Sequence, residues 1–325
     1  MKSRARRYPF GLVHFFAALV CAHAGAFDLE GHRGARGLAP ENTIPGFERA
    51  LSIGVTTIET DVGVTRDGVV VISHDPFLNP DVVRGADGRW LSAPGPAIRS
   101  LDFATLRTYD IGRLDPASKY AQQFPQQRAS DGARFPRLSE LFDLAKASGK
   151  TVRFNVETKI TPTSGDTTPD PATFTRLVIA AVRDAGIADR VTIQSFDWRT
   201  LREVSRTAPD IRTACLTIQT PNNDTVTPDA SGASPWHAGL AMRDHGGSMP
   251  ALVKAAGCRV WSMFWRNLTA DDVTRSHAIG VEVLPWTVND PADMARLIDV
   301  GVDGIITDYP DRLRTVMAEK KLPLP

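Results

Sequence analysis

The strongest constraint on the fold of this chain is a unit that recurs along most of its length. The unit is an amphipathic helical segment, then a glycine, then a run rich in β-branched residues. It reads SIG before VTTIETDV, ASG before KTVRFNVE, and DAG shortly before RVTIQSF. It continues as AAG before CRVWSMF, AIG before VEVLPWT, and DVG before VDGIITD. Glycine is expected just past the end of a helix, because it adopts the left-handed conformation that closes the last turn.

This alternation predicts a parallel sheet with helical connections. Asp170-Pro171 and Asp290-Pro291 are typical of helix starts and support it. Eight such strands predict a (β/α)8 barrel, which is the fold class we expect. A doubly wound sheet also alternates strands and helices, but the glycine-rich dinucleotide fingerprint that would favour it is absent. The expected strands are residues 27–33, 55–62, 151–158, 190–196, 211–218, 259–264, 282–288 and 303–307.

The chain departs from the repeat in two places, after the second strand and after the fifth. Residues 65–68 read TRDG, a tight-turn sequence, so the run VVVISHD is expected to return antiparallel to the second strand. Residues 76–135 are rich in Gly, Pro, Asp and Arg, which indicates a small insertion after the second strand. Residues 219–248 form a long loop after the fifth strand, on the face where loops shape substrate entry.

The first 26 residues are typical of a cleaved export signal. Four basic residues precede an apolar run from Phe10 to Val20, and small residues follow at 22–26. The run is short for a membrane anchor. Arg6-Arg7 matches a twin-arginine signal weakly, and Cys21 lies in a poor context for lipid attachment. We therefore expect a secreted or periplasmic protein with one domain over residues 27–325.

Charge and hydropathy exclude two kinds of partner. The formal net charge is +1, and loss of the four basic signal residues leaves −3, which disfavours non-specific binding to nucleic acid. No later apolar run is long enough to span a membrane, so no stable membrane insertion is expected. The oligomeric state is left open. Export permits a disulfide between Cys215 and Cys258, but two buried free thiols fit the sequence equally well.

Polar residues at the carboxyl ends of the strands would build the active site of such a barrel. The second strand carries Glu59 and Asp61 two residues apart, hence on one face, and the next barrel strand carries Glu157 and Lys159 with the same spacing. Three converging carboxylates repel one another unless a cation neutralises them, and their oxygens suit Ca²⁺ or Mg²⁺ better than Zn²⁺. Separate salt bridges, such as Glu157 with Lys159, are the structural alternative.

Two histidines are candidates for acid–base chemistry. The segment GHRGARGLAPENT, residues 31–43, places His32 and Arg33 at the end of the first strand, and His74 follows the returning hairpin strand. Arginine makes forked contacts with phosphate oxygens, and the pKa of histidine lies nearest neutrality. Two histidines can supply the base and the acid that phosphodiester hydrolysis needs.

The remaining candidates are weaker. Arg36 and Arg84 are possible substrate contacts, although loop arginines are more often solvated. His237, His245 and His277 are expected to be structural, and His237 and His245 are weaker candidates for substrate contact because they lie in the loop 219–248. A cysteine–histidine cluster with zinc spacing, a phosphate-binding Walker loop and a GxSxG elbow are all absent from the sequence.

Taken together, these motifs resemble the glycerophosphodiester phosphodiesterase family, and its exported bacterial members in particular. HRGARGLAPENT resembles the family's opening motif, and IETDVGVTRDGVVVISHDP resembles its second motif with the hairpin and histidine. NVETK, IQSFDWRTL, PWTVN and DGIITDYPDRL occur in the expected order. The likeness covers nearly the whole chain after the signal. Gly63, Thr158 and the segments 76–135 and 219–248 depart from it.

The resemblance implies metal-dependent hydrolysis of glycerophosphodiesters to sn-glycerol 3-phosphate and an alcohol, such as choline or ethanolamine. It implies a divalent cation, Ca²⁺ or Mg²⁺, held by Glu59, Asp61 and Glu157. It matches His32 and His74 to the acid–base pair and Arg33 to a phosphate contact. The residues expected to support substrate binding are Glu41, Lys159 and Trp286.

The sequence leaves two alternatives open. A phospholipase D-like hydrolase of intact lipids would use the same barrel site but needs an exposed apolar rim, for which Trp236, Leu240 and Met242 are the candidates. A non-catalytic binding protein on this fold should tolerate losses among the site residues, all of which are present here.

Overall fold

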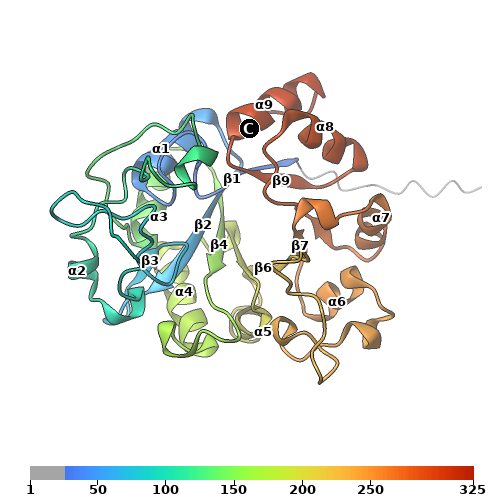
Figure 1. The fold of residues 1–325 in the computed structure, drawn as a ribbon. Coiled ribbons are helices and arrows are strands. Elements are labelled where there is room, and N and C mark those ends of the chain that lie inside the picture. The colour runs from blue at the N-terminus through green and yellow to red at the C-terminus, as the bar shows by residue number, and fades with distance from the viewer. Residues whose placement is uncertain (1–25) are drawn as a thin grey trace, which may run out of the picture.

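The computed structural model describes residues 26–325, so the expected signal, apart from its last residue, lies outside the described residues. Eight parallel strands follow one another around a barrel, which confirms the fold class and excludes the doubly wound alternative (Figure 1). The strands are β1 (Asp28–Gly31), β2 (Thr57–Val64), β4 (Arg153–Thr158), β5 (Val191–Ser195), β6 (Arg212–Thr217), β7 (Val260–Met263), β8 (Glu282–Val283) and β9 (Gly304–Thr307).

The barrel closes between β8 and β9 through individual backbone hydrogen bonds. The N–H of Ile306 donates to the carbonyl of Pro285, and the N–H of Val288 donates to the carbonyl of Ile306, each at 3.0 Å. The expected strand 282–288 is too long, because β8 ends at Val283. Pro285 has no N–H to donate to a neighbouring strand, so the regular ladder cannot continue through it.

Helices cover the outside of the strands, as the alternation predicts (Figure 1). Asp170 and Asp290 accept hydrogen bonds from the first turns of α4 and α8, so both expected helix starts are confirmed. Gly54 and Gly186 close α1 and α4 in the left-handed conformation. The helices are α1 (Ile44–Ile53), α3 (Leu138–Ala147), α4 (Pro171–Ala185), α5 (Trp198–Thr207), α6 (Met249–Ala255), α7 (Ala270–Ala278), α8 (Pro291–Val300) and α9 (Pro310–Glu319).

The expected hairpin is present. β3 (Val70–Ile72) pairs antiparallel with β2, with Val62 opposite Ile72. The segment 76–135 then covers one side of the barrel with short helical turns and its own small core around Leu78, Leu106 and Phe135 (Figure 1). Its helices are η1 (Ile98–Ser100), α2 (Phe103–Leu106) and η2 (Ala121–Gln123).

The loop 219–248 folds back onto the barrel through η5 (Pro235–His237) and η6 (Met242–His245). The ring of His237 stacks on Trp198, with the ring centres 4.2 Å apart. Cys215 in β6 and Cys258, just before β7, form a disulfide, which decides the pairing that the sequence left open. Within residues 26–325, no helix combines the length and the apolarity that crossing a bilayer requires.

The inside of the barrel has two different halves. Side chains from β6 to β9 make a small apolar cluster of Ala214, Val260, Leu284 and Ile306. Side chains from β1, β2, β4 and β5 are polar and buried, namely Glu30, Glu59, Asn155 and Gln194. The main apolar core lies between the strands and the helices, around large side chains such as Trp198, Phe174 and Phe47. The polar half leads to the site described next.

Candidate active site

His32 lies immediately after β1, at the end of the barrel where all eight strands have their carboxyl termini. Its Nδ1 is 2.7 Å from Oδ1 of Asp308, whose pKa is held well below its usual range by Arg36 and by His32 itself, against the effect of burial. An ionised carboxylate can only accept, so Nδ1 donates and Nε2 keeps its lone pair. Burial, and then Arg36, lower the pKa of His32 to about 4.

Arg33 is fixed by three carboxylates in the turn after β1. Its backbone has a positive φ of 51°, and its N–H lies 2.7 Å from Oε2 of Glu59. Its Nη1 is 2.7 Å from Oε1 of Glu41, and its Nε is 3.3 Å from Oδ2 of Asp61. The turn needs the following Gly34, because a Cβ at this position would lie 2.9 Å from a backbone carbonyl of α1.

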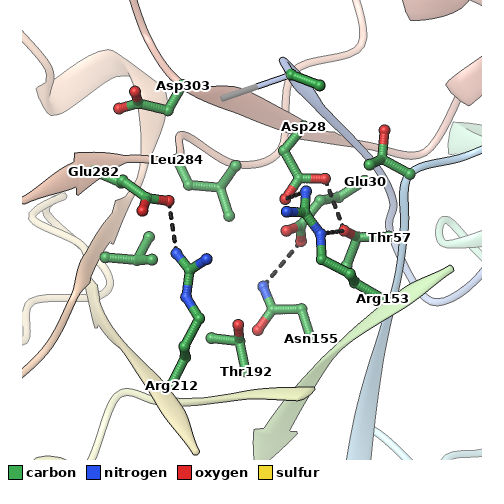
Figure 2. A pocket seen from close by; sticks show the side chains of 13 residues that line it. Asp28, Glu30, Thr57, Arg153, Asn155, Thr192, Arg212, Glu282, Leu284 and Asp303 are labelled. Atoms are coloured by element: carbon green, nitrogen blue, oxygen red, sulfur yellow. Dashed lines mark hydrogen bonds and ion pairs between the residues drawn. The ribbon is translucent and has the colours of Figure 1, made fainter. Parts of the chain in front are cut away.

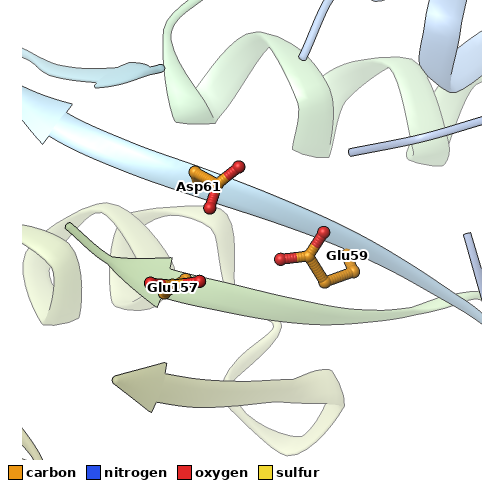
Figure 3. A group of neighbouring side chains, drawn as sticks. All are labelled: Glu59, Asp61 and Glu157. Carbon is orange, nitrogen blue, oxygen red and sulfur yellow. The ribbon is translucent and has the colours of Figure 1, made fainter. Parts of the chain in front are cut away.

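The three expected metal-binding carboxylates converge (Figure 3). Glu59 and Asp61 project from β2 toward Glu157 on the neighbouring β4, and one oxygen of each lies within 4.8 Å of the other two. All three side chains are buried. Burial, with the charges of its neighbours, raises the pKa of Glu59, and burial raises the pKa of Glu157 to about 7. Three ionised carboxylates would place excess negative charge in this buried site, and the raised pKa values of Glu59 and Glu157 reflect that cost.

Cationic side chains balance this charge only in part. Lys159 Nζ lies 2.7 Å from Oε1 of Glu157 and 3.5 Å from Oδ1 of Asp61, so the expected Glu157–Lys159 salt bridge exists beside the cluster. Arg33 is shared between Asp61 and Glu41. Only two cationic side chains, Arg33 and Lys159, thus lie beside four carboxylates, those of Glu41, Glu59, Asp61 and Glu157. Oδ1 of Asp61 is buried without a hydrogen-bond partner among the described residues. An oxygen-only donor set with two unbalanced negative charges fits a hard divalent cation.

His74 lies just after β3, in the loop that returns toward the barrel. Its Nδ1 is 2.9 Å from Oδ1 of Asp75, and Asn79 donates to the other oxygen of that carboxylate at 2.8 Å. Burial, and then Arg33, lower the pKa of His74. The side chain is about one-third exposed, with 31% of its surface accessible, whereas His32 keeps only 12%. His74 is therefore the more accessible of the two histidines.

One cavity of about 180 Å³ brings most of the expected site residues together. Its wall is apolar on the side of Phe196, Leu216, Trp286 and Ile306. The rings of Phe196 and Trp286 pack edge to face, with ring centres 5.5 Å apart. The polar side of the wall consists of His32, Arg33, Arg36, Glu59, His74, Glu157, Lys159 and Gln194. Among the expected residues, Glu41 and Asp61 lie behind this wall, against Arg33.

Sequence reasoning missed the group that orients His32. Asp308, directly after β9, also accepts two bonds from Arg36, at 2.8 and 3.1 Å. Asn289 donates to it at 2.7 Å. The sequence favours a solvated loop position for Arg36, but the side chain lines the cavity. The sequence does contain a signal for Asp308. This residue directly follows the expected strand 303–307, within the motif DGIITDYPDRL.

Two further residues were missed. Asn42, with a positive φ of 55°, donates to Asp61 Oδ2 at 2.9 Å. Tyr120, from the segment 76–135, donates its hydroxyl proton to Glu41 and accepts from Arg36 at 3.1 Å. Asn42 lies in the APENT part of the opening motif, whereas no sequence pattern around Tyr120 indicates a role.

His237, His245, His277 and Arg84 do not line this cavity, and Arg84 is held in ion pairs rather than solvated. Arg84 pairs with Asp110 and Asp131 inside the segment 76–135. His277 pairs with Asp303 at 2.8 Å. His237 and His245 belong to the loop 219–248.

The fold and this arrangement of side chains define a barrel enzyme, and comparison with known proteins identifies its family. The model of the glycerophosphoryl diester phosphodiesterase family matches residues 32–312. A glycerophosphodiester phosphodiesterase of Caldanaerobacter subterraneus is 30% identical over 282 residues, which cover 87% of this chain and 94% of the relative. One from Bacillus subtilis is 28% identical over 294 residues, covering 88% and 84% of the two chains. The chain belongs to the glycerophosphoryl diester phosphodiesterase family, as its motifs predict.

Solved structures agree with this assignment. A Silicibacter pomeroyi protein assigned as a glycerophosphoryl diester phosphodiesterase is 34% identical, with a TM-score of 0.81 over 92% of this chain and 96% of the other. A phosphodiesterase of Oleispira antarctica, solved with the product sn-glycerol-3-phosphate, shares the fold at 21% identity, with a TM-score of 0.65 over 89% and 96% of the two chains.

Proposed function

We propose that this chain is an exported, metal-dependent enzyme that hydrolyses glycerophosphodiesters to sn-glycerol 3-phosphate and an alcohol. The observation that carries the proposal is that His32, His74, Arg33 and two of the three clustered carboxylates line a single cavity. The product bound to the Oleispira antarctica phosphodiesterase is the one that this reaction would release.

Glu59, Asp61 and Glu157 are the residues that would hold Ca²⁺ or Mg²⁺. A divalent cation bound there would polarise a non-bridging phosphoryl oxygen. Arg33 would bind a second phosphoryl oxygen and stabilise charge in the transition state, since Glu41 and Asp61 hold its guanidinium in place. Lys159, which lines the cavity, adds positive charge beside Glu157. Trp286 would pack against the apolar part of the substrate.

His32 and His74 would share the proton transfers. One Nε2 takes the proton from the attacking hydroxyl as the new P–O bond forms. The other histidine, protonated, gives its proton to the alkoxide as the P–O bond to the alcohol breaks. The attacking hydroxyl is that of water or that of the substrate's own glycerol, and the second route passes through a cyclic phosphate that water opens. Asp308 and Asp75 orient the two rings through Nδ1.

The test is to incubate the purified mature protein with glycerophosphocholine in Ca²⁺, in Mg²⁺ and in excess chelator, and to identify both products. We expect sn-glycerol 3-phosphate and choline with at least one metal, and neither in chelator. Release of phosphocholine would mean that the other P–O bond breaks and would refute the proposed reaction. Equal release in chelator would refute the metal dependence.

The alternative of a lipid-cleaving enzyme lacks the rim that it needs. Leu240 and Met242 pack against the main core rather than standing out from the loop 219–248, and Trp236 contacts Phe196. The large apolar side chains that stand exposed within residues 26–325 are Phe77, Ile279 and Leu324, and none of them belongs to this loop. Phe77 alone lies near the site, in a cavity wall that it shares with His74, and a single side chain does not make an apolar rim. Soluble deacylated diesters therefore suit the site better than intact lipids.

Export is the remaining part of the proposal. The signal pattern of residues 1–26 supports it, and so does the Cys215–Cys258 disulfide, because disulfides persist mainly in oxidising compartments. Mass spectrometry of the protein from the periplasmic fraction should give a chain that begins near Phe27. An intact chain beginning at Met1 and confined to the cytoplasm would contradict export.

A further inference from the structure

A continuous row of buried hydrogen bonds crosses the inside of the barrel and ends on Glu59. Nε2 of Gln194 donates to Oε1 of Glu59 at 3.0 Å. Nδ2 of Asn155 donates to Oε1 of Gln194 at 3.1 Å and to Oε2 of Glu30 at 2.9 Å. The four side chains come from four adjacent strands, β1, β2, β4 and β5, and none is more than 3% exposed. We call Glu30, Asn155 and Gln194 the amide row.

The amide row begins at a second cavity, of about 230 Å³, at the opposite end of the barrel (Figure 2). The two arginines of this cavity already have partners. Arg153 pairs with Asp28 at 2.7 Å and Arg212 pairs with Glu282 at 2.6 Å. Figure 2 shows Glu30 instead joined to the amide of Asn155. Glu30 therefore serves the amide row as a hydrogen-bond acceptor.

We propose that Gln194 is a positioning residue that fixes the carboxylate of Glu59 for cation binding, and that Asn155 and Glu30 fix Gln194. The proposal rests on the proposed function in one respect, which is that Glu59 is a cation ligand. Both oxygens of Glu59 are then held from opposite sides. Gln194 donates to Oε1, and the backbone N–H of Arg33 donates to Oε2 at 2.7 Å.

The direction of every amide in the row follows from its first member. Oε2 of Glu30 is the acceptor of the first bond in the row, so the facing atom of Asn155 is its nitrogen. That same nitrogen reaches Gln194, so the facing atom there must be the oxygen, and the Gln194 nitrogen is left to face Glu59. A flipped Gln194 would set an amide oxygen against the Glu59 carboxylate, and two acceptors repel. The amide row therefore keeps the hydrogen-bond donor Nε2 of Gln194 beside the carboxylate of Glu59.

The test measures the affinity for Ca²⁺ by calorimetry, without substrate. Groups that orient a metal ligand typically contribute about 10- to 100-fold to metal affinity. We expect that loss from Gln194→Leu, and a smaller loss from Asn155→Leu. The double variant should lose less than the product of the two single losses, because Asn155 acts through Gln194. Thr192→Val is the matched control, since Thr192 lies on the same strand and lines the second cavity.

The Glu30 variants separate the acceptor role from the charge. Glu30→Gln keeps an acceptor oxygen and should bind Ca²⁺ like the wild type, whereas Glu30→Leu should weaken binding. If Gln194→Leu does not fold, Asn155→Leu and the Glu30 pair still decide the question. The proposal is overturned if Gln194→Leu and Thr192→Val bind Ca²⁺ equally, or if the losses in the Asn155/Gln194 double variant simply multiply.

Crystal structures of the metal-free wild type and of Gln194→Leu provide the readout that does not depend on a metal. We expect the Glu59 side chain to leave its wild-type rotamer in the variant. An unchanged Glu59 would refute the positioning role. If the wild type itself binds neither Ca²⁺ nor Mg²⁺, the proposed cation site fails, while these two structures still decide whether Gln194 orients Glu59.

Discussion

Each histidine of the candidate site forms a hydrogen bond with an aspartate through its Nδ1. Asp308 holds Nδ1 of His32, and Asp75 holds Nδ1 of His74. The sequence predicts both histidines, because His32 directly follows a strand and His74 lies two residues after one. It does not predict Asp308, because this residue lies 276 positions from His32 and reaches it only through the pairing of β1 with β9. Residues that act by closing the barrel are therefore harder to predict than residues in local motifs.

The first prediction concerns Asp308. Asp308→Asn should lower kcat by about 10²-fold, because an amide cannot hold the His32 tautomer and Arg36 as the carboxylate does. Steady-state kinetics on glycerophosphocholine measure it. Asp303→Asn is the matched control, since Asp303 also bonds a histidine, His277, and lines the cavity at the other end of the barrel. Equal rates for the two variants would contradict the assignment.

The second prediction concerns His237 and acid stability. Burial lowers the pKa of His237 to about 4, and its Nε2 has no hydrogen-bond partner among the described residues. In the unfolded chain the histidine pKa is near 6.5, so the unfolded chain binds a proton in a pH range where the folded chain does not. The free energy of unfolding therefore falls as the pH drops from about 6.5 toward 4. Between pH 7 and pH 5 this costs about 2 kcal/mol.

Urea unfolding at the two pH values measures this effect in the wild type and in His237→Phe, which keeps an aromatic ring against Trp198. The free energy of unfolding of the variant should fall by about 2 kcal/mol less than that of the wild type. An equal fall in both proteins would mean that His237 is not the group responsible.

At the scale of elements, the barrel strands were predictable and the segment 76–135 was not. Strands such as 151–158 and helix ends such as Gly186 carry strong local signals. The segment 76–135 has little periodicity, so nothing in the sequence indicates that Tyr120 reaches Glu41 and Arg36. Strand 282–288 was overextended because its β-rich composition outweighed Pro285.

The third prediction is that Tyr120→Phe lowers kcat/KM by about 10- to 100-fold. The change removes the hydroxyl that holds the charged groups of Glu41 and Arg36, and the loss of one hydrogen bond to a charged group, about 1.5–3 kcal/mol, corresponds to this range. Its matched control is Tyr109→Phe in the same segment, where Tyr109 packs against the small core instead. If the two variants are equally active, the segment 76–135 contributes no hydroxyl to the site.

The fourth prediction concerns the disulfide that joins β6 to the start of β7. It closes a loop with a sequence separation of 43. Reduction should lower the free energy of unfolding by about 2–4 kcal/mol, because the unfolded chain gains freedom. Urea unfolding with and without reductant measures the loss. The Cys215→Ala/Cys258→Ala variant should not respond to reductant, and an unresponsive wild type would contradict the bridge.

In the whole molecule, the two ends of the barrel hold different sets of polar residues. The carboxyl ends of the strands gather the histidines, Arg33 and the three carboxylates around one cavity. The opposite end holds paired charges and the start of the amide row. The repeat of helix, glycine and strand predicts this architecture. The amide row could not be predicted, because its members are ordinary polar residues whose distances depend on the strand register.

In the proposed reaction, His32 and His74 transfer the protons while a cation held by Glu59, Asp61 and Glu157 binds the phosphodiester. The most direct measurement is the rate at which sn-glycerol 3-phosphate is released from glycerophosphocholine by the mature wild type, His32→Ala, His74→Ala and the control His277→Ala. We expect metal-dependent release by the wild type and His277→Ala, and a loss of about 10²–10⁴-fold in each of the other two variants. Wild-type rates in His32→Ala or His74→Ala would contradict the proposed reaction.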